Sequence, residues 1–264
     1  MSSRRAFLSS TLLLILLPAI LGGTPTSVRA AERVEITVSA AISLKNAFEE
    51  LGALYEKQSG VGVLFNFGAS GQLLQQLIGG APVDVFASAA QQDVDEAERR
   101  GLLLPDSRAN FAGNQLVLVV PAASHSRLAS FKGLSHKDVQ RIAVGNPRSV
   151  PVGRYAREVL LFHKLLPALE RKLIYAENAR QVLDWVARGE VDAGVVYATD
   201  AASRPHEVRL VAQAQDASHT PIVYPAAVVR GTPHQAQARA FLSLLLSEAG
   251  QEILGRHGFQ RATR

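Results

Sequence analysis

The sequence predicts an α/β protein built as two lobes, in which mostly parallel sheets are flanked by helices. Strand-like and helix-like patterns alternate along most of the chain, which is the arrangement that produces parallel sheets. The 264 residues are 47% apolar and 19% charged, an ordinary globular composition and enough chain for two cores of roughly 100–130 residues each. The alternation also restarts after Pro121, which places a second lobe in the middle of the chain.

The first half of the chain alternates between a period of two and a helical period. Val34, Ile36 and Val38 alternate with polar residues, as in a half-buried strand, whereas Leu44, Phe48 and Leu51 recur at helical spacing. The predicted elements are, in order, a strand at 34–38, a helix at 44–55, a strand at 61–67, a helix at 73–78, a strand at 83–87, a helix at 91–100 and a continuous apolar strand at 116–120.

The second half repeats this alternation and ends in helices. The predicted elements are a strand at 142–144, a helix beginning at Arg154, a strand at 173–175, a helix at 179–186, strands at 193–197, 208–211 and 223–229, and a helical stretch at 241–254. The apolar runs at 116–121 and 223–229 are interpreted as the two crossings between lobes. This interpretation predicts one lobe from residues 31–112 and 221–264 and another from residues 113–220.

The first 30 residues are predicted to be an export signal that is removed. Arg4 and Arg5 form a short positive region, an apolar core follows at 12–21, and small residues suit cleavage after Ala30. The apolar core is shorter than the roughly 20 residues that a membrane-spanning helix needs. Residues 3–8 also resemble a twin-arginine export signal. The mature protein is therefore expected to be soluble and exported.

Loss of this segment changes the charge balance. The full chain carries 28 basic and 23 acidic residues, a formal charge of +5. Removal of Arg4, Arg5 and Arg29 leaves 25 basic residues against 23 acidic ones, a balance of +2. The remaining basic residues are scattered and form no stripe with interleaved aromatic residues, so a nucleic-acid partner is not expected.

Motifs for covalent, cofactor or metal chemistry are missing. The chain has no cysteine, which excludes disulfides and thiolate chemistry. Residues 68–71 read Gly-Ala-Ser-Gly, but Gln72 stands where a nucleophile elbow needs glycine. The glycines at 60–62 lack the third glycine of a dinucleotide fingerprint, no phosphate-binding loop is present, and the seven histidines show no metal-site spacing. We therefore expect no enzyme activity and no cofactor.

Four helix starts made of small or capping residues each follow a predicted strand. Ser43 and Ser70 open the first two helices, and residues 146–153 and 177–179 precede the other two. In open α/β sheets, ligands bind at the carboxyl ends of strands, where the first turn of the next helix presents unpaired N–H groups. If the four starts converge, they form an anion site of N–H and hydroxyl donors. For any one position alone, ordinary helix capping explains these residues equally well.

The same segments resemble the molybdate-binding proteins of bacterial ABC uptake systems, which belong to the type 2 periplasmic binding proteins. The similarity covers most of the mature chain. The segments that carry it are residues 40–48, 67–73, 79–89, 113–121, 143–156 and 194–201. Each is modest alone, but their order and spacing are specific. The resemblance implies a ligand cleft between the two lobes.

The resemblance also implies a set of ligand-binding residues. Ser43 and Ser70 would each donate a hydroxyl and a backbone N–H, Val152 and Ala179 would each donate a backbone N–H, and Tyr197 would donate its phenol hydroxyl. Read without the resemblance, Tyr197 is a half-buried strand tyrosine. The oxyanion would be held through its oxygens, with no direct bond from protein to metal. Three departures from the family pattern are the bulky Ile42, the Gly-Ala-Ser-Gly segment, which offers fewer hydroxyls, and the loose match around Ala179. Arg180 beside Ala179 is expected to be a solvated residue at a helix start.

The function that follows is periplasmic capture of molybdate, and also of tungstate, for an ABC transporter permease in the inner membrane, by a protein expected to be a monomer. Alternatives are a binding protein for another small oxyanion, such as sulfate or phosphate, and a sensor module without a transport partner. A hydrolase that uses Ser70 would need a nearby base, which the sequence does not supply.

Overall fold

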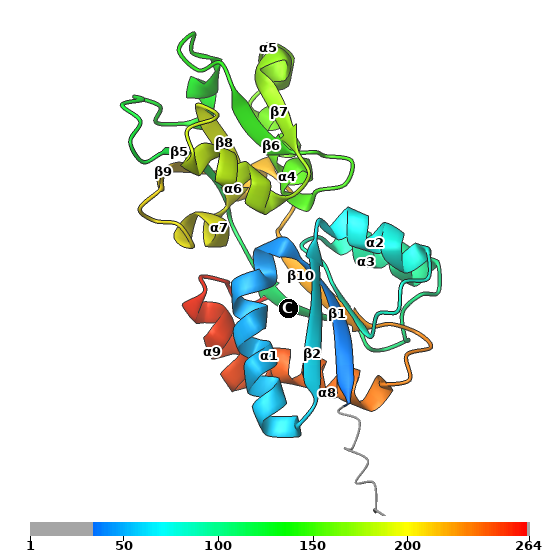
Figure 1. Ribbon diagram of the computed structural model, residues 1–264. Helices are drawn as coiled ribbons and strands as arrows, with labels where there is room; N and C mark the ends of the chain where they lie inside the picture. The colour runs from blue at the N-terminus through cyan, green and yellow to red at the C-terminus, as the bar shows by residue number, and fades with distance from the viewer. Residues whose placement is uncertain (1–33, 263–264) are drawn as a thin grey trace, which may run out of the picture. The chain divides into compact units, whose positions relative to one another are not determined.

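The computed structural model describes residues 34–262, and the predicted export signal at 1–30 lies outside these residues. The described chain contains two five-stranded sheets with helices packed against them (Figure 1). The first sheet has the strand order β2-β1-β3-β10-β4 and the second has the order β7-β6-β8-β5-β9. The two-lobed α/β class predicted from the sequence is therefore confirmed.

The first sheet collects strands from both ends of the described chain. Its strands are β1 (Glu35–Ala41), β2 (Gly62–Gly68), β3 (Val85–Ala87), β4 (Ala109–Gly113) and β10 (Val223–Val228). The helices of this part are η1 (Ile42–Leu44), α1 (Lys45–Ser59), α2 (Ser70–Ile78), α3 (Gln91–Arg99), α8 (Gln235–Leu246) and α9 (Glu248–Arg256).

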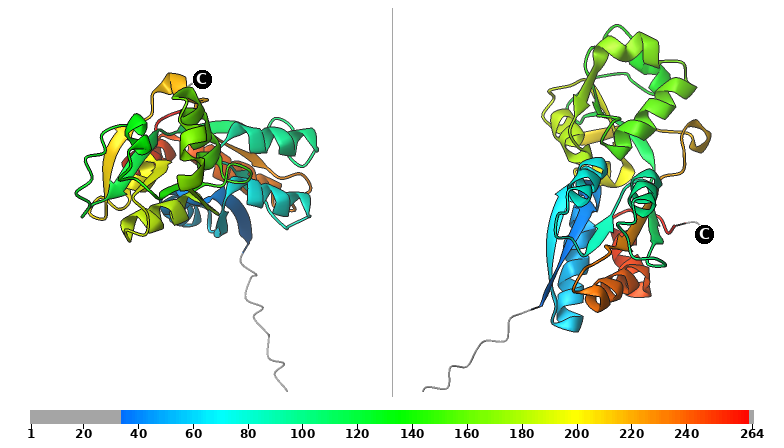
Figure 2. Two further views of the ribbon diagram at one scale, coloured as in Figure 1. Left: turned by 90° about the horizontal axis from the view of Figure 1, so that it is seen from above. Right: turned by 90° about the vertical axis from the view of Figure 1, so that its right-hand side faces the viewer.

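Helices cover both faces of this sheet (Figure 2). On one face, Phe48 of α1 packs edge-to-face against Phe241 of α8, with ring centroids 5.9 Å apart. On the other face, Leu73 of α2 and Val94 of α3 share a separate apolar cluster with Phe86 of β3. Burial on both faces explains why this half of the chain reads as alternating amphipathic helices and apolar strands.

The second sheet is formed by the middle of the chain. Its strands are β5 (Leu116–Pro121), β6 (Ile142–Gly145), β7 (Leu173–Ala176), β8 (Ala193–Tyr197) and β9 (Val208–Gln213). Its helices are η2 (Phe131–Ser135), α4 (Pro151–Phe162), α5 (Leu166–Leu169), η3 (Glu170–Lys172), α6 (Ala179–Ala187), α7 (Ala198–Ala202) and η4 (Asp216–Ser218). Among residues 34–262, no helix is both long and apolar enough to span a membrane.

Each sheet is mixed, but four of its five strands run in one direction, so the expectation of mostly parallel sheets is confirmed. In the first sheet, β1 pairs in parallel with β2 and β3, whereas β10 pairs antiparallel with β3 and β4. In the second sheet, β6 pairs in parallel with β7 and β8, whereas β5 pairs antiparallel with β8 and β9. The antiparallel strands are the two that begin immediately after the chain has passed from one sheet to the other.

Those two strands were also expected to be the crossings themselves, and this prediction is wrong. The runs at 116–121 and 223–228 are interior strands of the two sheets. The chain passes from the first sheet to the second through residues 114–115 and returns through residues 214–222. A continuous apolar run indicates a strand that is covered on both faces, and β5 is buried along all but its last residue. The predicted lobe boundaries remain a prediction.

Two further details differ from the sequence expectations. The strand β4 was not predicted, because its sequence Ala-Asn-Phe-Ala-Gly lacks both β-branched residues and a clear alternation. Helix α4 begins at Pro151 rather than at Arg154. Proline suits the first helical position because it lacks only an N–H group that would have no partner there.

Candidate functional site

The five residues predicted to bind a ligand line one small cavity. Ser43, Ser70, Val152, Ala179 and Tyr197 all border it, and all are buried, with between 0% and 6% of their surface exposed. Ala41, Ile42, Gly68, Ala69, Ala89, Val150 and Pro151 complete the lining. The cavity has a volume of about 10 Å³, far below the roughly 300–1,000 Å³ of sites for drug-sized ligands. Its size therefore suits a small ion.

Two neighbouring strands of the first sheet place the serines. Strands β1 and β2 run parallel and in register as far as Ala41 and Gly68, so they end at the same edge of the sheet. Ser43 follows in the short 3-10 helix η1, and Ser70 is the first residue of α2. Because N–H groups in the first turn of a helix have no partner within that helix, both serines can offer a backbone donor beside the hydroxyl.

The second sheet repeats this arrangement. Strand β6 lies between β7 and β8 and is parallel to both. Val152 is the second residue of the helix after β6, Ala179 is the first residue of the helix after β7, and Tyr197 is the last residue of β8. Two unpaired backbone N–H groups and one phenol therefore lie at a common sheet edge, and each helix start adds a partial positive charge.

The hydroxyl of Ser70 is oriented by the backbone behind it. The N–H of Ala89 donates to Ser70 Oγ at 3.0 Å, and this contact is buried. Because a backbone N–H can only donate, Ser70 Oγ is the acceptor of this bond and its own proton remains available. Ser70 therefore presents a proton donor to the cavity.

Tyr197 carries a buried hydroxyl with no hydrogen-bond partner among the described residues. Its side chain is 1% exposed. Burial raises the pKa of its phenol well above the ordinary value, and the nearby Tyr224 adds to this effect. Tyr197 therefore keeps its proton at neutral pH, and an unpaired buried donor of this kind is uncommon without a ligand to satisfy it.

The charged residues Arg180 and Asp200 pair with each other outside the cavity lining. Arg180 was expected to be solvated, but its side chain is only 23% exposed, and its Nη2 lies 3.6 Å from Oδ1 of the buried Asp200. Its Nη1 also donates to Ser203 Oγ at 3.3 Å. Burial raises the pKa of Asp200 to about 6, although the positive charge of Arg180 opposes this rise.

Two hydrogen bonds between the two halves of the molecule lie beside the cavity. Arg154 Nη2 of α4 donates to Asp93 Oδ2 of α3 at 2.7 Å. Burial raises the pKa of Asp93, against the attraction of Arg154. The N–H of Gly71 donates to the carbonyl oxygen of Ser149 at 3.0 Å. These contacts hold the two halves of the molecule together beside the cavity.

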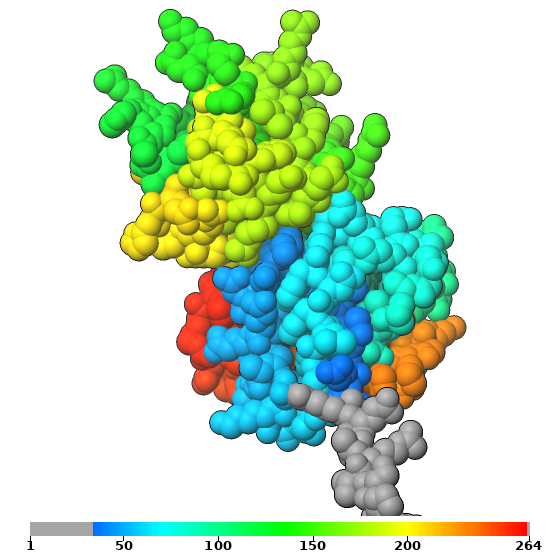
Figure 3. Space-filling model, in the orientation of Figure 1, coloured from blue at the N-terminus to red at the C-terminus, as the bar shows by residue number. Residues whose placement is uncertain are grey.

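A third polar contact is exposed: Gln72 Nε2 donates to Glu177 Oε2 at 3.0 Å. Figure 3 shows that the cyan surface of the first lobe adjoins the yellow-green surface of the second. Gln72 belongs to the predicted serine segment, and Glu177 precedes Ala179. The segments that supply ligand donors thus also supply contacts between the lobes.

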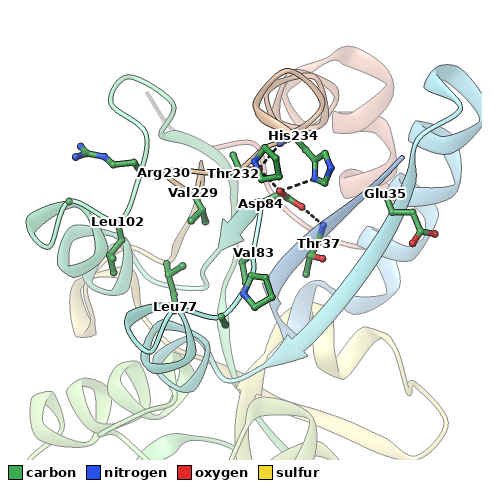
Figure 4. A pocket seen from close by; sticks show the side chains of 16 residues that line it. Glu35, Thr37, Leu77, Val83, Asp84, Leu102, Val229, Arg230, Thr232 and His234 are labelled. Carbon is green, nitrogen blue, oxygen red and sulfur yellow. Dashed lines mark hydrogen bonds and ion pairs between the residues drawn. The ribbon is translucent and has the colours of Figure 1, made fainter. Parts of the chain in front are cut away.

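A larger cavity, of about 490 Å³, lies near the first residues of β1 and is lined by Glu35, Thr37 and Asp84, among other residues (Figure 4). The carboxylate of Asp84 accepts the Thr37 N–H at 2.6 Å, a hydroxyl hydrogen bond from Thr232 and a 3.3 Å contact with His234 Nδ1. These bonds tie the loop after β10 to β1, so Asp84 has a structural role. The cavity lies at the opposite end of β1 from Ser43.

Metal coordination by side chains has no candidate in residues 34–262, which hold no cluster of three or more His, Asp or Glu residues. Sequence reasoning missed several residues that surround the cavity, above all Tyr224 and the Asp93–Arg154 pair. A tyrosine in an otherwise apolar strand is one available signal, because a buried phenol usually has a polar partner. The identity of that partner cannot be read from spacing.

Comparison with known proteins identifies relatives over nearly the whole described chain. The family of bacterial extracellular solute-binding proteins matches residues 36–260. The molybdate-binding protein ModA of Escherichia coli is 36% identical over 233 residues, which are 87% of this chain and 90% of that protein. The solved structure of the periplasmic molybdate-binding protein of Azotobacter vinelandii superposes with a TM-score of 0.78 at 25% identity, covering 86% of this chain and all of that chain. The sulfate-binding protein SubI of Mycobacterium tuberculosis shares the fold, with a TM-score of 0.76 at 18% identity and coverage of 87% of both chains.

Proposed function

Because this chain belongs to the bacterial extracellular solute-binding protein family, we propose that it captures molybdate, and also tungstate, for uptake by an ABC transporter. The oxyanion is held through its oxygens by Ser43, Ser70, Val152, Ala179 and Tyr197, and no protein atom bonds to the metal. The curated relatives named as molybdate-binding proteins support this choice of ligand. The protein binds its ligand and catalyses no reaction.

One observation carries the proposal: neutral donors from five separate segments, all on buried residues, line a single small cavity. A dianion can be bound without a positive side chain when hydrogen-bond donors are already oriented and hidden from water. The hydroxyl of Ser70 meets both conditions, and the hydroxyl of Tyr197 meets the second. Discrimination against sulfate, which has the same shape and charge, is assigned to the size of the cavity.

Ligand capture is proposed to close the two lobes around the ion. The lobes are residues 31–112 with 221–264, and residues 113–220, and closure rotates them about the crossings at 114–115 and 214–222. The Gly71–Ser149 and Arg154–Asp93 bonds are then formed in the closed state. The closed monomer presents both lobes to a permease in the inner membrane.

Titration calorimetry on residues 31–264 with molybdate, tungstate, sulfate and phosphate tests the proposal. We expect binding heat with molybdate and tungstate, weaker or no binding of sulfate and phosphate, and unchanged ligand recovered afterwards. The absence of heat with both molybdate and tungstate would falsify the proposal. Tight binding of sulfate or phosphate alone would instead assign the protein to another oxyanion.

The periplasm is the proposed location, reached by an export signal at residues 1–30 that has a twin-arginine character. Fractionation of cells that express the full chain should recover the protein from the periplasm, shortened by about 30 residues. Replacement of both Arg4 and Arg5 by lysine should block export if the twin-arginine route is used. Unchanged export of that variant would assign the protein to the general secretory route.

A further inference from the structure

We propose that Tyr224, held by Asn114, is a positioning residue that locks the hydroxyl of Ser43 as a proton donor to the ligand. As a result, the site selects oxyanions that carry no proton. This inference rests on the proposed function, because it concerns the same cavity. It adds two residues that do not line the cavity and assigns to them a part of the ligand selectivity.

The orientation of the Asn114 amide follows from its three contacts. Its Oδ1 accepts the backbone N–H of Gln115 at 2.9 Å, and an N–H cannot accept, so the oxygen must face Gln115. Its Nδ2 then donates to Thr199 Oγ1 at 2.8 Å and to Tyr224 Oη at 3.2 Å. Both amide protons and the amide oxygen are thereby used, and the side chain has one orientation.

The Asn114 amide in turn sets the direction of the Tyr224 hydroxyl. Tyr224 Oη accepts from Asn114 and lies 3.1 Å from Ser43 Oγ, and both contacts are buried. The Tyr224 side chain is 0% exposed, and burial raises the pKa of its phenol, so the proton stays on the oxygen. The arrangement that gives this proton an acceptor is donation from Tyr224 to Ser43.

Ser43 Oγ therefore accepts from behind, and its own proton remains for the cavity that Ser43 lines. The Ser70 hydroxyl proton is also left for the cavity, because the N–H of Ala89 donates to the Ser70 oxygen. Both serines thus act only as donors toward the ligand. A deprotonated oxyanion matches such a site, whereas an oxyanion with an O–H group brings a proton that finds no acceptor at these hydroxyls.

The positions of Asn114 and Tyr224 explain why residues outside the cavity can orient the Ser43 hydroxyl within it. Asn114 lies in the outgoing crossing between the sheets, Thr199 lies in α7, which directly follows β8 of the second sheet, and Tyr224 lies in β10 of the first sheet. The two lobes and the crossing thus meet in one chain of hydrogen bonds. The proton on Ser43 is oriented by contacts that the sequence separates by up to 181 residues.

Calorimetry on Tyr224→Phe, Ser43→Ala and the double variant tests the inference. Tyr224→Phe leaves Ser43 free to rotate, so we expect molybdate affinity to fall about tenfold, the loss of one hydrogen bond to a charged ligand. Affinity for sulfate should fall with it, whereas affinity for phosphate, which carries a proton near neutral pH, should hold or rise. In the Ser43→Ala background, the effect of Tyr224→Phe on molybdate should disappear.

Tyr55→Phe is the matched control, because Tyr55 is a buried tyrosine of the same lobe whose hydroxyl donates to the Gln237 carbonyl instead. Its ligand affinities should equal those of the wild type. The inference would be overturned if Tyr224→Phe left molybdate affinity unchanged, or if it lowered that affinity equally in the wild-type and Ser43→Ala backgrounds. Either result would leave the proposed function intact. Failure of the wild-type protein to bind any of the oxyanions would overturn the proposed function, and this inference with it.

Discussion

Gly71 at the start of α2 donates its backbone N–H to the carbonyl oxygen of Ser149, 3.0 Å away in the loop before α4. The approach is so close that a Cβ on residue 71 would lie 2.6 Å from that oxygen and 3.0 Å from the Ser149 Cα. Both obstacles are backbone atoms, which cannot rotate aside as a side chain can. Glycine at this position therefore permits the two lobes to meet beside Ser70.

We expect Gly71→Ala to weaken molybdate binding by tenfold or more, because the methyl group obstructs the closed arrangement. Gly255→Ala is the control, because a Cβ there meets nothing within 4 Å. Calorimetry measures the affinities, and equal affinity of Gly71→Ala and wild type would show that the two segments do not need to approach for binding.

Ser70→Ala should reduce both ligand affinity and stability. The substitution removes a donor from the cavity and leaves the buried N–H of Ala89 without its acceptor. We expect an affinity loss of about 1–3 kcal/mol and a lower melting temperature. Ser243→Ala is the control, because Ser243 Oγ bonds only to the carbonyl of Arg239 on an exposed part of α8. A loss of stability with unchanged affinity would reduce Ser70 to a structural role.

Tyr197→Phe should move stability and affinity in opposite directions. The hydroxyl is buried without a partner, so its removal should stabilise the ligand-free protein by about 1 kcal/mol. The same change removes a donor to the oxyanion and should lower affinity about tenfold. Melting temperatures with and without molybdate measure both effects, with the exposed Tyr175→Phe as control. A fall in ligand-free stability would contradict the assignment of an unsatisfied hydroxyl.

Asp200 should make the folded state more stable in acid than at neutral pH. Its pKa is raised from 3.8 to about 6 by burial, so the folded state holds this proton over a range in which the unfolded chain has lost it. The stabilisation that protonated Asp200 gives the folded state is fully present below about pH 4 and is lost as the pH rises through about 6. A shift of this size corresponds to about 2–3 kcal/mol.

Asp200→Asn tests this dependence, because the amide cannot titrate. The melting temperature of the wild type, relative to that of the variant, should fall between pH 4 and pH 7. The comparison cancels the opposite trend of exposed carboxylates such as Glu50, whose pKa is lowered by hydrogen bonds from His257 and Arg256. A constant difference between the two proteins across this range would show that Asp200 does not titrate there.

The helix starts were predictable because their cause is local. Ser70 and Ala179 each follow an apolar strand and open a helix in the sequence, and both do so in the structure. Parallel neighbouring strands then bring such starts to one sheet edge. The resemblance to a family added Val152 and Tyr197, which spacing alone leaves as a helix-start residue and a strand tyrosine.

Other features depend on contacts between distant segments. Periodicity indicates that 223–228 is a strand but not that β10 lies between β3 and β4 and runs antiparallel to both. This placement sets Tyr224 beside Ser43, across 181 residues. The pairing of Arg180 with the buried Asp200 was likewise invisible, and Arg180 was wrongly expected to be solvated.

The amino-acid sequence alone was thus enough to establish the alternating elements and the two-lobed class, because these follow from periodicity. It also predicted uncharged donors at helix starts, and the resemblance to a family assigned the individual residues. Only the folded chain decided which way each hydroxyl proton points and how closely the lobes approach. Those properties arise where residues such as Asn114, Tyr224 and Ser43 meet, and a hydrogen bond has a direction only once its partners are in place.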